Sequence, residues 1–312
     1  MKKRQITDTV LMVRPAHFGF NPQTAENNAF QSAETQLSAA EIQILAVQEF
    51  DQFVQKLREA KIRAIVVQDS EQPIKYDAVF PNNWFSTHEN GMIITYPVFA
   101  PMRRLERREE ILTAIADEFQ HHRRIHLEER ERKQLFLEGT GSLILDRPNH
   151  IAYACRSVRT SEQVIDYFCE HMNYEKVLFT ATDAAGQDIY HTNVMMALGE
   201  DFVVICMESV ENEEDRRILE QKFAASQKEI IEISLEQVSA FAGNMLQVRN
   251  REGDTFLVMS EQAYRSLDDV QKAQIARYTN ILYSPLYTIE QFGGGSARCM
   301  MAEIFSREEG ED

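Results

Sequence analysis

The chain has 312 residues, of which 44% are hydrophobic and 26% charged, which excludes a disordered, collagen-like or coiled-coil protein. Its 33 Lys and Arg residues against 49 Asp and Glu residues give a net charge of −16, so nucleic acid and anionic membrane surfaces are poor partners. No apolar run approaches the roughly 18 residues of a membrane helix. The four cysteines are widely spaced, which indicates a reduced, cytoplasmic protein with neither a disulfide framework nor a zinc site.

The predicted elements begin with a strand at residues 10–14. A capping box at Ser38 and Glu41 then predicts the start of a helix, because the serine hydroxyl accepts from a backbone N–H of the first turn while the glutamate reaches back. Apolar residues at helical spacing continue this helix to about residue 57. A short apolar strand at residues 62–67 follows it.

A related unit then recurs, in which a small or polar cluster opens a strand, a turn and a second strand. These segments cover residues 80–98, 137–156, 190–207 and 242–259, with turns at 89–91, 147–150, 199–201 and 250–254. Gly, Asn, Asp and Pro between β-branched runs are typical of hairpin turns. Helices separate the segments, with further capping boxes at 160–163 and 234–237, and strands follow at 124–127, 177–180, 230–233 and 281–283.

A fifth opening, at residues 293–305, has a single strand before the chain ends. We expect the strand at residues 10–14 to be its partner, so that both ends of the chain share one sheet. The starts near 80, 137, 190, 242 and 293 give a period of about 51–57 residues, which is typical of propellers, solenoids and arrays. One unit cannot bury both faces of its sheet. We therefore predict one α/β domain over residues 1–312, built as a five-bladed pseudosymmetric α/β propeller.

The polar openings of such a propeller would converge near its axis. They contain Asn82, Asn83, Glu138, His191, Asn193, Asn244 and Cys299. A cysteine, a histidine, a carboxylate and several amides in one cavity suit a covalent thiolate enzyme, in which the thiolate attacks an sp² carbon and the histidine moves protons. Cys299 follows a glycine run and Arg298, which would favour a thiolate. The other cysteines, Cys155, Cys169 and Cys206, lie in apolar sequence and are expected in the core.

Three other features have simpler explanations. His121, His122 and His126 are crowded by arginines, so metal binding is not expected there. The charged stretch at residues 103–110 is expected to form a solvated helix face. The glycine run at residues 293–295 lacks the Gly-Lys-Ser/Thr of a phosphate loop.

Taken in order, these motifs resemble the guanidino-group-modifying superfamily of arginine deiminases, dimethylarginine dimethylaminohydrolases, agmatine deiminases and amidinotransferases. The family motifs Phe-x-x-Asp, Glu-Gly-Gly-Asp, His-x-Asp and a Gly-rich segment ending in Cys correspond here to residues 80–83, 138–141, 191–193 and 293–299. Residues 156–160 are similar to the family loop whose arginine binds the substrate carboxylate, which points to Arg159. The resemblance implies a five-bladed α/β propeller, with Cys299 as nucleophile.

The departures from the family pattern concern its acids. Asn83, Asn193 and Gly141 stand where the family has aspartates, whereas Glu138 remains. A carboxylate only accepts hydrogen bonds, whereas an amide also donates. Amides therefore suit a neutral ureido group, which has one carbonyl acceptor, and leave a guanidinium poorly neutralised. The pattern resembles the citrulline hydrolase branch, with Glu138 as the one carboxylate expected near the reacting group.

The mechanism expected from this resemblance starts with attack of Cys299 on the ureido carbon. An amide of Asn83 or Asn193 would donate to the developing oxyanion. His191 would protonate the departing nitrogen and then activate water, while Glu138 accepts from substrate N–H groups. Arg159 would pair with the α-carboxylate. The products would be ornithine, carbon dioxide and ammonia.

Asn82 and Asn244 complete the predicted substrate-binding set. No metal or organic cofactor is implied, and the expected partner is a small amino-acid substrate, with no nucleic acid and no membrane. A homo-oligomer is compatible with the sequence. One alternative is an arginine deiminase or amidinotransferase that uses the same Cys, His and Glu. Another is a non-catalytic propeller like the ribosome anti-association factors, against which the retention of all three residues argues.

Overall fold

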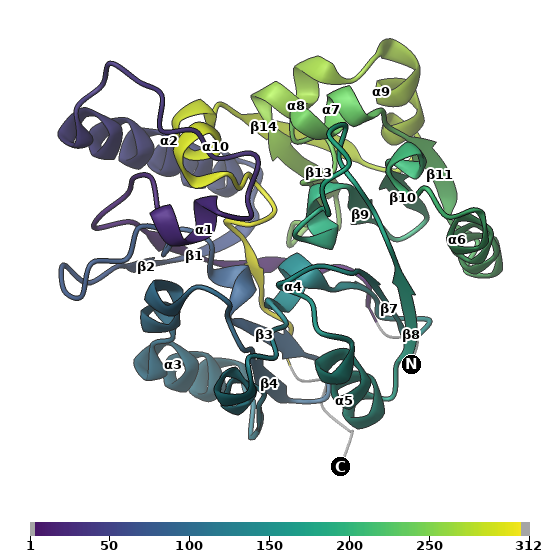
Figure 1. The fold of residues 1–312 in the computed structure, drawn as a ribbon, viewed down its shortest axis with the longest axis horizontal. Coiled ribbons are helices and arrows are strands. Elements are labelled where there is room, and N and C mark those ends of the chain that lie inside the picture. Colours follow the sequence, from purple (N-terminus) through teal and green to yellow (C-terminus); the bar gives the residue numbers. More distant parts are fainter. Residues whose placement is uncertain (1–3, 307–312) are drawn as a thin grey trace.

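The computed structural model describes residues 4–306, which form five three-stranded sheets with helices between them (Figure 1). The sheets comprise β15-β1-β2, β3-β4-β5, β6-β7-β8, β9-β10-β11 and β12-β13-β14. In each sheet an antiparallel pair is joined by a parallel third strand. This third strand follows a helical connection, as parallel pairing requires a crossover. The predicted repeat of hairpin, helix and strand is therefore confirmed.

The strands are short, and their bounds are as follows. They are β1 (Thr9–Arg14), β2 (Arg63–Gln68), β3 (Phe85–His88), β4 (Met92–Thr95), β5 (Arg123–His126), β6 (Ile144–Asp146), β7 (Ile151–Cys155), β8 (Glu175–Phe179), β9 (Met196–Leu198), β10 (Phe202–Ile205), β11 (Glu229–Glu232), β12 (Leu246–Arg249), β13 (Thr255–Ser260), β14 (Asn280–Ser284) and β15 (Ala302–Glu303).

The helices are α1 (Pro22–Ala25), α2 (Ala39–Glu59), α3 (Glu109–Phe119), α4 (Gly139–Ser142), α5 (Glu162–Met172), α6 (Glu213–Ala225), α7 (Leu235–Ser239), α8 (Glu261–Ser266), α9 (Asp269–Ala276) and α10 (Tyr287–Gly293). Short 3₁₀ turns are η1 (Pro81–Asn83), η2 (Pro101–Glu106), η3 (Glu128–Lys133), η4 (Thr192–Val194) and η5 (Met207–Ser209). Within residues 4–306, no helix has the length and apolar character needed to cross a membrane.

The two ends of the chain share a sheet. Strand β1 pairs antiparallel with β15, with Val10 opposite Glu303 and Leu11 opposite Ala302. On its other side β1 pairs in parallel with β2. The predicted pairing of the fifth unit with the N-terminal strand is thus confirmed. The two-residue strand β15 pairs with β1, which is far from it in the sequence.

Two of the three predicted capping boxes are present. The hydroxyl of Ser38 accepts from the N–H of Glu41, whose carboxylate accepts from the N–H of Ser38, and Ser234 forms the same arrangement with Gln237. The box predicted at Thr160 is wrong, because Ser161 is the N-cap of α5 and makes no side-chain cap bond. The Thr160 hydroxyl instead donates to Ser142 Oγ at 2.9 Å, so a tertiary contact replaces the local one.

The core lies around the first two strands of each sheet. Every residue of β7 and β10 is buried, whereas the third strands β5 and β14 are partly exposed. Buried strands need apolar residues on both faces, which explains the continuous apolar runs in these segments. Cys155, Cys169 and Cys206 are buried within the core clusters, as predicted, and all four cysteines are free thiols.

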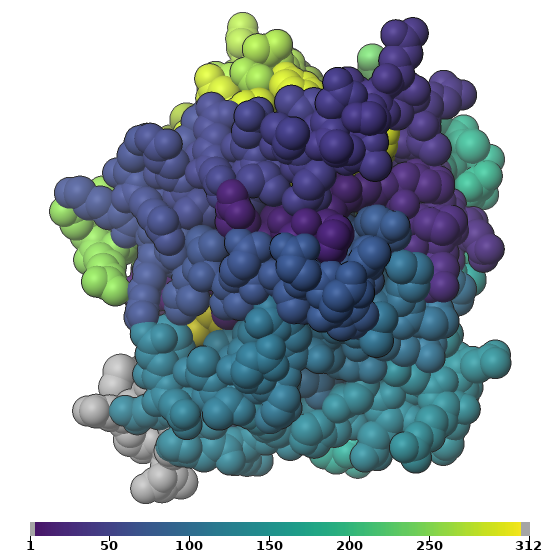
Figure 2. Space-filling model, turned by 90° about the vertical axis from the view of Figure 1, so that its left-hand side faces the viewer, coloured from purple at the N-terminus to yellow at the C-terminus, as the bar shows by residue number. Residues whose placement is uncertain are grey.

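The site is built from the short turns that precede the first strand of successive sheets. Turn η1 precedes β3, α4 precedes β6 and η4 precedes β9. Helix α4 contacts both η1 and η4, so polar openings that are far apart in sequence meet near the middle of the molecule (Figure 1). The face shown in Figure 2 is formed mainly by the N-terminal half of the chain, and the yellow C-terminal segment shows at the top and in small gaps.

Candidate active site

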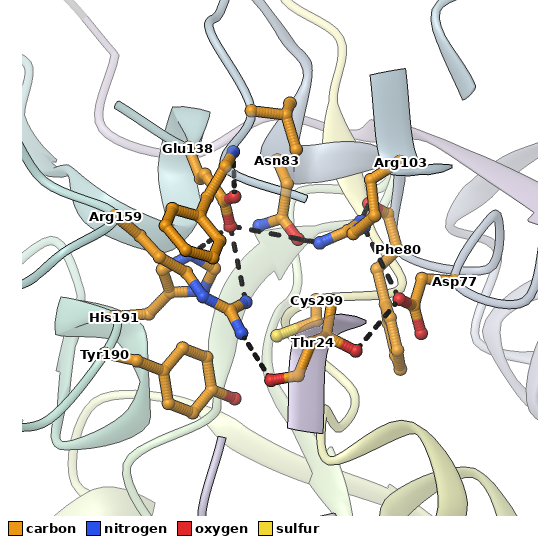
Figure 3. A network of polar contacts seen from close by, with 12 residues as sticks. Thr24, Asp77, Phe80, Asn83, Arg103, Glu138, Arg159, Tyr190, His191 and Cys299 are labelled. Atoms are coloured by element: carbon orange, nitrogen blue, oxygen red, sulfur yellow. Dashed lines mark hydrogen bonds and ion pairs between the residues drawn. The ribbon is translucent and has the colours of Figure 1, made fainter. Parts of the chain in front are cut away.

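The thiol of Cys299 is held by two amide groups. Its Sγ accepts from Nδ2 of Asn193 at 3.3 Å and from Nδ2 of Asn244 at 3.2 Å. The residue is only 3% exposed, yet it lines a cavity together with His191, Asn83 and Arg159 (Figure 3). Hydrogen-bond donors around a sulfur favour its anionic form, because hydrogen bonding to a charged state stabilises that state. The arrangement can therefore present a nucleophile to a small ligand.

His191 is paired with Glu138, whose Oε2 lies 2.7 Å from His191 Nε2. Burial lowers the pKa of His191 to about 4, although the bond to Glu138 opposes the shift. Burial alone would raise the pKa of Glu138, but Arg159, His191 and Arg103 together hold it well below its usual range. At neutral pH the pair is therefore a neutral imidazole beside a carboxylate, and the imidazole can accept a proton.

Two arginines flank the same carboxylate. Arg159 Nη1 lies 3.5 Å from Glu138 Oε2, and Arg103 Nη1 lies 3.9 Å from the same oxygen. The guanidinium of Arg159 also donates to Asn27 and to the carbonyl of Thr24, and it stacks over Tyr190 with its central carbon 4.7 Å from the ring centre. Figure 3 shows Arg159 between Glu138 and Thr24. Its predicted pairing with a substrate carboxylate would require it to exchange one of these partners.

The carboxylate of Asp77 lines the cavity itself, which that of Glu138 does not. Its Oδ2 accepts from Asn21 Nδ2 at 2.7 Å, whereas its Oδ1 has no hydrogen-bond partner in residues 4–306. Arg103 Nε lies 3.7 Å from Asp77 Oδ2. Burial raises the pKa of Asp77, and Arg103 opposes that shift. A cationic group next to the free oxygen would stabilise the ionised carboxylate further.

The side chains around the cavity leave little free space inside it. Its volume is about 20 Å³, close to what one water molecule needs and far too small for an amino acid. Thr24 and Asn28, from the N-terminal segment around α1, form part of the wall. A ligand of amino-acid size can enter only when this segment or the arginines move.

The predicted amides fall into two groups. Asn83 lines the cavity, its Oδ1 accepts from Arg103 and its Nδ2 has no partner within residues 4–306. Asn193 contacts the sulfur and leaves its Oδ1 without a partner in the same described range. Asn82 is completely buried, with neither side-chain polar atom bonded there, and Asn244 binds the sulfur. The cavity is lined by Asn83, Arg159, His191 and Cys299 but not by Asn82. Asn193, Asn244 and Glu138 do not line it either, but each contacts a residue that does.

Two expectations about charged residues are wrong. Arg103 and Glu106 are 3% and 4% exposed, so they do not belong to a solvated helix face: the arginine binds the glutamate through two bonds. Glu138 is not the one nearby carboxylate, since Asp77 lines the cavity. The guanidinium of Arg298 bonds the carbonyl of Met301 and the carboxylate of Glu303, and it also interacts electrostatically with Cys299, as expected.

The sequence carried a weak signal for the two missed residues. Asp77 lies three residues before the Phe-x-x-Asn motif, among apolar residues where an acid is unusual. Arg103 lies in a run of arginines and glutamates that hides it. Its burial depends on η2 folding back over η1, which no local pattern encodes.

The histidine cluster is dispersed. His121 is 3% exposed, whereas His126 is exposed and lies 2.9 Å from Glu128. No group of three or more His, Cys, Asp or Glu side chains within residues 4–306 has an arrangement that could hold a metal ion.

Comparisons with known proteins identify the family. The family model described as N,N dimethylarginine dimethylhydrolase, eukaryotic, matches residues 14–306. Among solved structures the chain is similar to ArgZ, an arginine dihydrolase of cyanobacteria, at 18% identity and a TM-score of 0.74, covering 97% of this chain and 41% of ArgZ. The N-terminal domain of ArgZ bound to product matches at 18% identity and a TM-score of 0.71, covering 96% of this chain and 98% of that domain. The chain thus spans about two fifths of full-length ArgZ.

A further similar structure is a dimethylarginine dimethylaminohydrolase in adduct with S-methyl-L-thiocitrulline. It shares 15% identity at a TM-score of 0.65, covering 96% of this chain and 99% of that one. No curated protein sequence matches the chain. The family model matches residues 14–306, a range that includes strands of all five sheets and Cys299 with its cavity. The chain belongs to the N,N dimethylarginine dimethylhydrolase family, within the superfamily of guanidino-group-modifying enzymes.

Proposed function

We propose that this protein is a cysteine-dependent hydrolase that cleaves a C–N bond of a ureido amino acid, with citrulline as substrate and ornithine, carbon dioxide and ammonia as products. The observation that carries the proposal is the set of contacts around Cys299. Its sulfur receives two amide N–H groups, and the cavity that it lines also contains the unpartnered Nδ2 of Asn83. Amide N–H groups can donate to a ureido oxygen as it becomes an oxyanion. A guanidinium offers only N–H donors, so the same amide groups would find no acceptor on it.

The charged residues of the cavity fit the other end of an amino acid. Asp77 offers an unpartnered carboxylate oxygen to an ammonium, and Arg103 and Arg159 offer guanidinium groups to a carboxylate. The cavity wall thus carries groups of both charges, which can pair with the ammonium and the carboxylate of a zwitterion. This favours an α-amino acid over a simple urea as ligand. Binding energy from this end can be used to orient the ureido carbon at the sulfur.

In the proposed reaction the thiol proton of Cys299 passes to neutral His191 as the sulfur bonds to the ureido carbon. The protonated imidazole, stabilised by the Glu138 carboxylate 2.7 Å away, then gives this proton to the departing nitrogen as the C–N bond breaks. Water, losing a proton to His191, attacks the thiocarbamoyl carbon and releases the cysteine. The carbamate formed loses carbon dioxide and yields an amine.

Arginine is the second candidate substrate. Two carboxylates, Asp77 and Glu138, lie at or beside the cavity, and one of them could neutralise a guanidinium. The similar structures include an arginine dihydrolase and AgrE in complex with L-arginine. For this chain, hydrolysis of the guanidino group followed by hydrolysis of the ureido group would give the same ornithine.

The test is to incubate the purified protein with citrulline and with arginine separately, and to measure ornithine, ammonia and remaining substrate. We expect citrulline to be consumed at least about a hundredfold faster, because a guanidinium offers no acceptor to the amide donors, and each unpaired buried polar group costs about 1–3 kcal/mol. The Cys299→Ala variant should show no turnover of either. Equal consumption of arginine would replace the ureido proposal with the guanidino one.

We also propose that the five sheets surround one axis as a five-bladed propeller, in a single domain that comprises residues 1–312. The equal topology of the sheets supports this arrangement, as do the contacts of β15 with β3 and of β9 with both β6 and β12.

Four free thiols are compatible with the proposed cytoplasmic location. The proposed ligand is a small amino acid.

A further inference from the structure

Asn244 makes contacts with both the backbone and the side chain of Cys299. Its Oδ1 accepts from the backbone N–H of Arg298 at 3.0 Å and from that of Cys299 at 3.4 Å. These donors fix the orientation of the amide, so its Nδ2 must face the opposite way. Nδ2 donates to Cys299 Sγ at 3.2 Å and to the carbonyl of Asn193 at 3.0 Å.

The turn that carries Asn244 approaches η4 closely because residue 243 is glycine. A Cβ at Gly243 would lie 2.2 Å from the carbonyl oxygen of Val194, which real atoms do not allow. The side chain of Asn244 is 1% exposed and does not line the cavity that Cys299 lines. It therefore lies behind the sulfur, where a substrate in the cavity would not contact it.

Within residues 4–306 no cationic group donates a hydrogen bond to the sulfur or forms an ion pair with it, although the charge of Arg298 also acts on Cys299. Arg298 is bound to Met301 and Glu303, and His191 Nε2 is bound to Glu138. Burial lowers the pKa of His191 to about 4, so the imidazole is uncharged at neutral pH. The hydrogen-bond donors that face negative charge on Sγ are thus the amide N–H groups of Asn193 and Asn244.

We propose that Asn244 is a positioning residue that fixes Cys299 and stabilises its thiolate, and that it does not bind substrate as the sequence predicted. The inference rests on the proposed function only in taking Cys299 as the nucleophile. The thiol proton leaves to solvent or to His191, and the charge that remains on sulfur is held by amide dipoles. Hydrogen bonds to a charged acceptor stabilise it more than bonds to a neutral one, so the donor at residue 244 favours S⁻ over S–H.

The experiment measures the rate at which iodoacetamide labels the peptide that contains Cys299, at fixed pH, in wild type and three variants. In Asn244→Ala we expect labelling to slow by about tenfold to a hundredfold, the effect of losing one hydrogen bond to a charged group. Asn244→Asp keeps an acceptor for both backbone N–H groups but places a carboxylate oxygen beside the sulfur. Labelling in this variant should be slower still. Asn250→Ala, at the other end of β12, removes a buried turn amide and should label like wild type.

The directions separate positioning from simple damage to the fold. A loosened site exposes Cys299 and speeds labelling, whereas loss of charge stabilisation slows it. Labelling of Asn244→Ala at the wild-type rate or faster overturns the proposal, and so does a wild-type rate in Asn244→Asp. With a substrate that is turned over, kcat should fall while KM stays within about twofold of wild type. A rise in KM alone would instead assign Asn244 to substrate binding.

Labelling needs no substrate, so the outcome is independent of which amino acid the enzyme cleaves. If wild type consumes neither citrulline nor arginine but Asn244→Ala still labels slowly, the proposed function fails and the role of Asn244 stands. If citrulline is consumed but Asn244→Ala labels at the wild-type rate, the proposed function stands and the role of Asn244 fails.

Discussion

Asn83 accepts a hydrogen bond through Oδ1 from Nη1 of Arg103 at 2.7 Å. Arginine can only donate, so this bond fixes the amide and leaves Nδ2 as the unpartnered atom among the described residues. Asn83 lines the same cavity as Cys299. The buried arginine therefore makes Asn83 a hydrogen-bond donor towards the cavity.

The first prediction concerns this donor. Asn83→Asp should form an ion pair with Arg103 and lose the N–H that faces the cavity. We expect kcat/KM for citrulline to fall by about tenfold or more, from the 1–3 kcal/mol that a lost buried hydrogen bond costs. The double variant Asn83→Asp with Asn193→Asp should move binding towards arginine, measured as the ratio of the two KM values. A ratio unchanged from wild type would contradict the role given to the amides.

The second prediction concerns Gly141, at the fourth position of the motif that begins with Glu138. A Cβ at this position would lie 2.5 Å from Asn83 Nδ2 and 2.8 Å from His191 Nδ1, so no side chain fits while both residues keep their places. Gly141→Ala should lower the free energy of unfolding by about 1–3 kcal/mol, as overpacking does, and reduce kcat. Gly19→Ala, whose Cβ would meet atoms no nearer than 3.8 Å, is the matched control for urea unfolding and kinetics. Full activity in Gly141→Ala would show that Asn83 and His191 can shift without loss.

The third prediction tests the amino-acid end of the cavity. Asp77→Asn removes the negative charge proposed to hold the substrate ammonium, while its shape is kept. We expect KM for citrulline to rise by about tenfold, with a smaller change in kcat, because this end binds and orients the substrate. A ureido compound that lacks the α-ammonium should bind wild type and variant equally. An unchanged KM in Asp77→Asn would remove Asp77 from the binding site, and Asp51→Asn, a surface carboxylate paired with Arg14, serves as control.

The fourth prediction is the pH dependence of stability. Burial lowers the pKa of both His121 and His191 to about 4, from an ordinary value near 6.5. Between these values the unfolded chain binds more protons than the folded one, so the free energy of unfolding falls as the pH drops from about 6.5 to 4. Urea unfolding at successive pH values should show this loss.

His121→Phe isolates one part of that loss. His121 is 3% exposed, and phenylalanine supplies a ring of similar shape that cannot bind a proton. The variant should lose less stability between about pH 6.5 and 4 than wild type does. His171→Gln, at an exposed position, should follow the wild-type curve. An identical slope in His121→Phe would contradict the assignment.

The fifth prediction concerns the four thiols. Burial raises the pKa of Cys155 to about 12 and that of Cys169 to about 11, and it also raises the pKa of Cys206. Thiols of this kind are inert to alkylation at neutral pH because the thiolate is the reactive form. Iodoacetamide should therefore label Cys299 first in the folded protein, as peptide mass spectrometry can show. Earlier labelling of Cys155 or Cys206 would remove Cys299 as the candidate nucleophile.

Most of the fold followed from local patterns. Hairpin turns, capping residues such as Ser38 and Ser234, and helical spacing of apolar residues predicted the repeated unit, because each acts over a few neighbouring residues. The failed capping box at Thr160 shows the limit of this reasoning. The Thr160 hydroxyl can either cap the helix that follows it or bond to Ser142, and in the structure it bonds to Ser142. The local sequence contains no information about this tertiary partner.

The sequence by itself determined the repeat, the pairing of the chain ends and the candidate set of Cys299, His191, Glu138 and the amides. Only the tertiary structure decided which charged groups surround them. Asp77 and Arg103 read as ordinary residues of a loop and a charged run, and they become part of the cavity because η2 packs against η1. The chain encodes such residues through long-range contacts, whose partners lie on elements that meet after folding. Motif order therefore predicted the candidate catalytic set, whereas the electrostatic surroundings that tune it depend on tertiary packing.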